Sequence, residues 1–198
     1  MDRLTFAFLL AGLLVATSKT QAQLELDIAG IPGSGQTTWT FSGSTTAFEI
    51  GGFDADSSDG QTFPNPGDFV KTLDLVELPA LSSNAFLTVN SDTEAITAVG
   101  VDDDTMGIVP GGNTDDIGVG LANQLSVADG DTVSWTGSLV VGFDLDEFNL
   151  GTFGPSSSGL TGTILEQLTI REVPEPSSLA LLSVGGVALL RRSVARNA

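Results

Sequence analysis

Aspartates form the clusters in this chain whose side chains could do chemistry. Asp54, Asp56 and Asp59 are closely spaced in a short run that ends at Gly60, and such a loop offers several oxygen ligands for calcium. The third aspartate and the glycine come one residue too late for an EF-hand, and no glutamate closes the loop, so the run is not an EF-hand. The alternative interpretation is a solvated acidic loop.

A second acidic cluster consists of Asp102, Asp103 and Asp104, and the pair Asp115-Asp116 follows it. Adjacent carboxylates repel one another, and a cation between them would relieve that repulsion. An acidic protein also carries such residues on ordinary loops. The sequence therefore predicts no cofactor other than calcium and leaves open whether either cluster binds it.

The residue types that the chain lacks exclude most catalytic chemistry. The sequence has no histidine and no cysteine, which excludes the usual zinc sites, a Ser-His-Asp or Cys-His nucleophile, and any disulfide. A carboxylate pair is the hydrolytic chemistry that remains. Asp144, Asp146 and Glu147 could supply one, but their spacing is also that of a strand end with its polar face outward. Nothing selects a pair, so we predict no enzyme and no catalytic residue.

Trp39 and Trp135 are the only tryptophans, and each lies in a segment rich in threonine and serine. An exposed indole at either position could stack on a sugar ring, whereas packing into a core is the alternative. Residues 39–44 and 135–138 both begin with Trp-Thr, but the similarity is too short to indicate a duplication.

Short runs of alternating apolar and polar residues dominate residues 23–172, and Gly- or Pro-containing turns such as Asp129-Gly130 separate them. This pattern predicts an all-β domain, an antiparallel β-sandwich that resembles a jelly roll, with a closed barrel as the alternative. The expected strands are residues 24–28, 37–41, 47–50, 69–78, 85–89, 95–101, 117–121, 132–143 and 163–171.

The C-terminal residues have the order of a membrane anchor. Val173, Pro174, Glu175 and Pro176 precede an uncharged run from Leu179 to Leu190, and Arg191 and Arg192 follow it directly. At 1.5 Å per residue, the 14 residues from Ser177 to Leu190 span about 21 Å as a helix, less than the ~30 Å of a bilayer core. We predict a short transmembrane helix with a basic stop. A buried helix is the alternative, but it would usually keep one polar stripe.

This tail closely resembles the PEP-CTERM sorting signal of exported bacterial proteins. The resemblance covers residues 173–198, about an eighth of the chain, with Val173-Pro174-Glu175-Pro176 as the sorting motif and Arg191-Arg192 as the basic stop. It implies that an exosortase-like protease processes the protein. It also implies a destination at the cell surface or in the exopolysaccharide matrix, with polysaccharide as a further partner.

The N-terminus has the features of a secretory signal peptide. Arg3 supplies a positive charge, Leu4 to Ala16 are apolar, and Thr20-Gln21-Ala22 offers small residues for signal peptidase. Ala16-Thr17-Ser18 is a second cleavage candidate, and an N-terminal core helix is the alternative structure. The expected organisation is a signal peptide (1–22), an acidic β-sandwich domain (23–172) and a sorting and anchor segment (173–198).

The charge of the central domain limits its partners. Residues 23–172 hold all but two of the 25 acidic residues, whereas Lys71 and Arg171 are their only basic ones. Such a charge disfavours nucleic acid and anionic surfaces. We therefore expect an exported, non-enzymatic protein of the cell surface or exopolysaccharide matrix. A calcium-assisted carbohydrate-binding module and a small carboxylate-dependent glycan hydrolase are the alternatives.

Overall fold

The computed structural model describes residues 23–48, 61–71, 76–102, 115–156 and 163–174. The predicted signal peptide and the predicted transmembrane helix lie outside these residues. In the part of the chain that is described, no helix has the length and hydropathy needed to cross a membrane.

The described residues are nearly all β, as the alternating sequence pattern predicts. One 3-10 helix, η1 (Leu145–Glu147), is the sole helical element among them. The strands are β1 (Leu24–Gly30), β2 (Thr37–Ser42), β3 (Ser44–Thr46), β4 (Gln61–Gly67), β5 (Val76–Pro79), β6 (Ser82–Ser83), β7 (Phe86–Val89), β8 (Asp92–Asp102), β9 (Asp115–Leu121), β10 (Thr132–Val141), β11 (Gly151–Phe153) and β12 (Leu165–Glu172).

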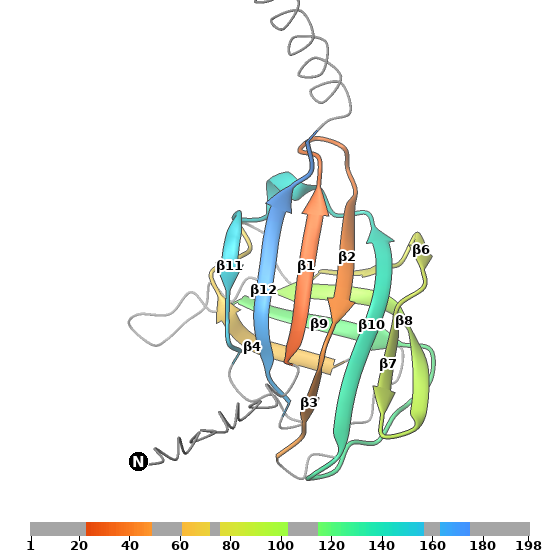
Figure 1. The fold of residues 1–198 in the computed structure, drawn as a ribbon. Coiled ribbons are helices and arrows are strands. Elements are labelled where there is room, and N and C mark those ends of the chain that lie inside the picture. Colours follow the sequence, from red (N-terminus) through yellow and green to blue (C-terminus); the bar gives the residue numbers. More distant parts are fainter. Residues whose placement is uncertain (1–22, 49–60, 72–75, 103–114, 157–162, 175–198) are drawn as a thin grey trace, which may run out of the picture.

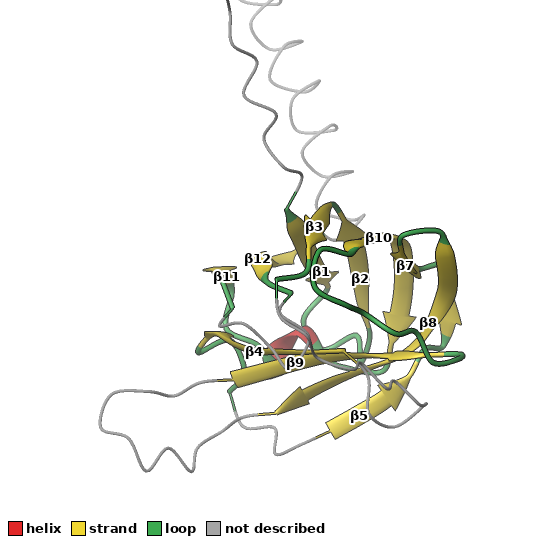
Figure 2. Ribbon diagram, turned by 90° about the horizontal axis from the view of Figure 1, so that it is seen from below, coloured by secondary structure: helices red, strands yellow, loops and turns green. Residues whose placement is uncertain are grey.

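The strands form one continuous sheet that folds over on itself into a near-barrel. Its main path runs β11-β12-β1-β2-β10-β7-β8-β9-β4, with β3, β5 and β6 paired beside it. Figure 1 shows one layer of β11, β12, β1, β2 and β10, behind which β4, β9 and β8 run across. Figure 2 shows the same two layers from below. The arrangement lies between the predicted sandwich and the barrel alternative.

Almost all strand pairs are antiparallel, but the first and last strands of the described domain are parallel. β1 pairs with β12 from Leu24 opposite Leu165 to Gly30 opposite Glu172. β1 also pairs antiparallel with β2, and β12 with β11. The sheet is thus predominantly antiparallel, as predicted, and the one parallel pair places the first and last strands of the described domain side by side.

Two glycines let neighbouring strands bend together. Gly43 separates β2 from β3 at φ 105°, and Gly137 bends β10 at φ 95°. A Cβ atom at Gly137 would lie 2.2 Å from the carbonyl oxygen of Asn84, so no other residue fits there. β10 pairs with β2 beyond the bend and with β3 and β7 before it, so the bend carries this strand from one layer towards the other. The two Trp-Thr segments noted in the sequence are thus adjacent strands.

Aromatic side chains fill the space between the layers. The Trp39 ring stacks on Phe143 at 6.1 Å, and the Trp135 ring contacts Phe41 at 5.0 Å and Phe63 at 5.2 Å. Each buried indole N–H has an acceptor, because Trp39 Nε1 donates to Thr37 Oγ1 and Trp135 Nε1 donates to the Ser42 carbonyl. Both tryptophans are at most 2% exposed. The core therefore uses them as packing residues with satisfied polar ends.

Some predicted strands are wrong. In the expected long strand at 69–78, residues 69–71 are not part of a strand, although Val70 forms an isolated bridge to Phe148. Residues 76–78 belong to β5, and residues 72–75 lie outside the described ranges. Ala47 and Phe48 follow β3 without being part of a strand, and residues 49–50 lie outside the described ranges. β4 was not expected, because its Pro64 and Pro66 suggested a turn.

Candidate functional site

The last strand of the domain leads directly into the predicted sorting segment. β12 ends at Glu172, and the backbone N–H of Val173 donates a 2.8 Å hydrogen bond to the carbonyl oxygen of Gly30. Pro174 has no N–H, so it cannot continue the ladder. The sheet therefore holds the chain as far as Val173 and ends at the first proline of the sorting segment.

Side chains just before this point fix the end of β12. Ile170 is buried, and Arg171 forms a bidentate pair with Asp27 of β1 through bonds of 2.9 and 2.8 Å. The hydrogen bonds and the charge of Asp27 raise the pKa of Arg171. Both side chains are partly exposed, so the pair contributes little to the free energy of unfolding, and its main effect is to fix the position of β12 against β1. Arg171 is one of the two basic residues in residues 23–172.

The loop between β1 and β2 lies at the same end of the domain. Its Gly33 and Gly35 have φ values of 74° and 70°, and their N–H groups donate to the two oxygens of Asp144 at 2.9 and 2.7 Å. Asp144 also accepts from Asp146 N at 2.9 Å, and so caps η1. The bonds from Asp146, Gly33 and Gly35 lower the pKa of Asp144. One carboxylate thus joins the loop to the helix.

Lys71 also holds η1 in place, through its backbone and its side chain. Its backbone N–H donates to the Glu147 carbonyl and its Nζ to the Asp146 carbonyl, both at 2.9 Å. Partial burial raises the pKa of Glu147.

Two apolar side chains are exposed at this end of the domain. Leu150, which follows η1, is 52% exposed, and Val173 is 40% exposed. We call the loop Ile31–Gln36, η1, Leu150 and Val173 the exit face, because the chain leaves the domain there (Figure 1).

The two ends of the described domain lie at opposite ends of the sheet. Because β1 and β12 are parallel, Leu24 pairs at the start of β12 and Gly30 pairs at its end. At about 3.3 Å per residue, the seven residues of β1 separate these levels by roughly 20 Å. The chain therefore enters β1 at the end of the domain opposite to the exit face.

Most of the predicted metal ligands lie outside the described residues. These are Asp54, Asp56, Asp59, Asp103 and Asp104. Asp102 ends β8 and lies opposite Asp116 of β9, so the structure brings these two acidic residues together across a strand pair. Among the residues that are described, no three potential metal ligands cluster. Calcium binding therefore stays a prediction.

Asp115 has a structural role that the sequence did not reveal. It is fully buried at the start of β9, and its Oδ2 accepts hydrogen bonds from the backbone N–H groups of Phe69 and Val70. These bonds fix the segment after β4, which contributes Phe69 and Val70 to the core. This role could not be predicted, since no local pattern in the sequence distinguishes a buried aspartate from an exposed one.

The structure corrects two further predictions about polar sites. Trp39 and Trp135 are buried in the core, so neither can stack on a ligand as predicted. Asp144, Asp146 and Glu147 belong to a capped 3-10 helix and not to a strand end, because Asp144 binds the β1–β2 loop.

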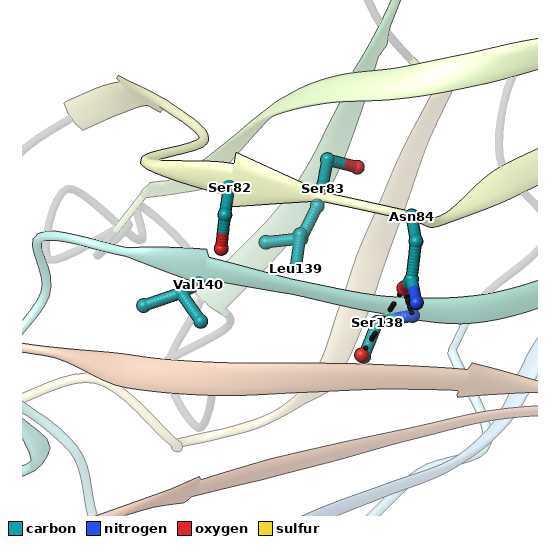
Figure 3. Close-up of a pocket in the computed structure, with 6 residues that line it drawn as sticks. All are labelled: Ser82, Ser83, Asn84, Ser138, Leu139 and Val140. Carbon is teal, nitrogen blue, oxygen red and sulfur yellow. Dashed lines mark hydrogen bonds between the residues drawn. The ribbon is translucent and has the colours of Figure 1, made fainter.

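A shallow groove of about 220 Å³ lies between β6 and β10. Figure 3 shows the Asn84 side chain pointing at Ser138, where Asn84 Oδ1 accepts from Ser138 N at 2.8 Å and Ser138 Oγ at 3.2 Å. The Ser83 hydroxyl donates to the Ile96 carbonyl at 2.7 Å. The Ser83 bond ties β6 to β8, and the Asn84 bonds tie the residue after β6 to β10, so the amide and hydroxyl groups of the groove serve the fold. The lining residues are Ser82, Ser83, Asn84, Ser138, Leu139 and Val140.

Comparison with known proteins identifies the exit segment and not the domain. No curated protein matches the chain, and no solved structure matches it. The PEP-CTERM protein-sorting motif matches residues 172–196, from the last residue of β12 through Val173, Pro174, Glu175, Pro176, Arg191 and Arg192. The chain therefore carries a PEP-CTERM sorting motif and is an exported protein, made as a membrane-anchored precursor that is processed through exosortase.

Proposed function

We propose that the protein is a non-enzymatic component of the cell surface or the exopolysaccharide matrix, released there once its tail is removed. The observation that carries this proposal is the direct junction between β12 and the sorting motif. The sorting motif begins at Glu172, the last residue of a strand in the sheet, so the β domain is the cargo that this motif delivers. Cleavage beyond Val173 would leave every described strand in place.

The described acidic residues support a structural role better than a catalytic one. Asp144 caps η1, and Asp115 holds the backbone of Phe69 and Val70. Asp131 accepts from Asn90 Nδ2 at 2.8 Å and Ala128 N at 2.7 Å in the turn before β10. A hydrolase of this composition would need two carboxylates facing each other across a groove. These three are instead committed to backbone and turn contacts.

The negative charge suits a released protein. Lys71 and Arg171 are the only cations of residues 23–172, and both have partners, in the Asp146 carbonyl and in Asp27. Such a surface repels anionic lipid headgroups and keeps neighbouring copies apart. Once the anchor is gone, electrostatics favours the aqueous matrix over the membrane.

A calcium-assisted carbohydrate-binding module is the second candidate function. One observation favours it, namely that Asp102 and Asp116 lie opposite each other where β8 meets β9; the predicted ligands Asp103 and Asp104 follow Asp102 in the sequence. Two carboxylates that lie opposite each other across a strand pair could both supply oxygen ligands to a calcium ion, and a bound calcium ion could also bind sugar hydroxyls.

The test is fractionation of the native host. Replacing Pro174, Glu175 and Pro176 with alanine should trap the protein in the membrane fraction, whereas the wild type appears in the surface and matrix fractions. The double variant Thr38→Ala and Thr40→Ala, at two exposed positions of β2, is the control and should distribute like the wild type. Equal distribution of the alanine-substituted motif and the wild type would contradict the proposal.

A further inference from the structure

We propose that the exit face is a docking surface for the membrane-embedded protease that removes the tail. This inference rests on the proposed function, since it concerns how that same processing step recognises its substrate. It adds that the folded domain, and not only the sorting motif, contacts the enzyme.

The first argument is that no linker separates the motif from the fold. The match to the sorting motif begins at Glu172, which still pairs with Gly30, and Val173 N–H still donates to the Gly30 carbonyl. A protease that binds Val173 to Pro176 in its cleft must therefore also contact the folded residues around Val173. The flanking structure is the exit face.

The second argument is that the end of β12 cannot readily unpair from the sheet to lengthen the free segment before the motif. Beyond the exposed Glu172, unpairing the strand would break the two Arg171–Asp27 hydrogen bonds and then expose Ile170 and Leu168, both of which are buried. β12 also pairs on both edges, with β1 and with β11. The enzyme must accept the folded end of the domain as it stands.

The third argument is that the exit face is stiff and partly apolar. Asp144 joins the β1–β2 loop to η1, and the Lys71 side chain and backbone hold η1 in place. Leu150 and Val173 are two of the five large hydrophobic residues that are exposed in the described domain. A pre-formed surface loses little conformational entropy when a partner docks, and its exposed apolar side chains can be buried in the contact.

The test measures the processing rate of the full-length precursor in its host by pulse-chase labelling. Leu150→Asp should slow tail removal about tenfold, the size of effect expected for a buried apolar contact in an interface. Phe48→Asp is the matched control, because Phe48 is 47% exposed and lies next to the turn before β10, at the opposite end of the domain. A second variant inserts about 12 Gly and Ser residues between Val173 and Pro174, which leaves the exit face intact but frees the motif from it. It should also slow processing, because docking then no longer positions the motif.

The outcomes separate this inference from the proposed function. If wild-type tails are removed and both variants are processed at the wild-type rate, the exit face is not a docking surface although the sorting proposal stands. Faster processing of the insertion variant would show that the domain is only an obstacle, which also overturns the inference. If the wild-type tail is never removed, the proposed function itself fails. A photoreactive side chain at position 150 should cross-link to the protease, and a cross-link to lipid alone would assign the face to the membrane and overturn the inference.

Discussion

The backbone N–H of Val173 donates a hydrogen bond to the carbonyl oxygen of Gly30, and this 2.8 Å contact joins the last residue that the sheet holds to the end of the first strand. It exists because β1 and β12 run parallel, so that both strands end at the same edge of the sheet. The sorting motif therefore leaves the domain beside the β1–β2 loop and η1. The fold therefore determines where on the domain the segment that is processed begins.

The Asp144 carboxylate should make the exit face sensitive to acid. Hydrogen bonds from Asp146, Gly33 and Gly35 lower its pKa in the folded state from the ordinary 3.8, so its contribution to stability is complete above that value. The contribution is lost as the pH falls below about 3.8 and through the lowered folded pKa. Asp144→Asn should therefore lower the melting temperature of the protein at pH 7, and the difference from wild type should shrink near pH 3.

Asp129→Asn controls for the loss of one negative charge, since Asp129 is exposed in the turn before β10, at the end of the domain opposite to the exit face. Hydrogen exchange at the Gly33 and Gly35 amides gives the local measurement and should be faster in Asp144→Asn at neutral pH. Unchanged exchange at both amides would show that Asp144 does not hold the loop.

Removing either buried indole should destabilise the core. Trp135→Ala should lower the free energy of unfolding by about 3–5 kcal/mol, because it leaves a cavity beside Phe41 and Phe63. Trp39→Phe keeps an aromatic ring but removes the donor to the buried Thr37 hydroxyl, and should lower that free energy by about 1–2 kcal/mol. Urea denaturation measures both values. Wild-type stability in either variant would show that this indole does not support the core.

The bend in β10 should be intolerant of a side chain. Gly137→Ala combines a positive φ with a Cβ contact at 2.2 Å from the Asn84 carbonyl oxygen, so the free energy of unfolding should fall by about 2 kcal/mol or more. Gly130→Ala is the matched control, since Gly130 has φ 85° but open space around its Cβ position, and should lose only about 1 kcal/mol. Equal losses in the two variants would mean that the close approach to Asn84 does not constrain β10.

Calcium should stabilise the protein if the acidic cluster at the end of β8 binds it. We expect millimolar calcium to raise the melting temperature more than equal magnesium does, because calcium accepts more oxygen ligands in an irregular site. Asp102→Asn should reduce the difference between the two ions, whereas Asp129→Asn should not. Equal effects of the two ions would leave only charge screening, and no effect of either would remove the calcium proposal.

The sequence predicted those strands whose burial alternates locally. The alternation around Leu26 and Ile28, and that around Trp39 and Phe41, correspond to β1 and β2, in which these four residues are buried. It missed β4, because Pro64 and Pro66 are turn signals by local rules and only the pairing with β9 makes their segment a strand. The parallel pairing of β1 and β12 was also missed, since a contact between residues about 140 positions apart leaves no local trace.

The candidate site, like the fold, was predictable only where a local stretch of sequence defines it. The sorting motif was evident because residue order alone defines it, and the comparison with known proteins confirms it. The exit face was not predictable, because Asp144 meets Gly33 and Gly35 only after β1, β2 and β10 have assembled. For the tryptophans the sequence left both roles open, since an indole in a Thr-rich strand fits either face of a sheet, and the structure places both rings inward.

Mass spectrometry of the C-terminal peptide of the protein from the surface and matrix fractions of its native host tests the central claim most directly. If the motif at residues 172–196 directs processing, the mature protein should end upstream of the Arg191-Arg192 stop, and no peptide containing Ser193 to Ala198 should be recovered from these fractions. Recovery of intact Ser193 to Ala198 on the extracellular protein would contradict the account and leave the tail as a plain anchor.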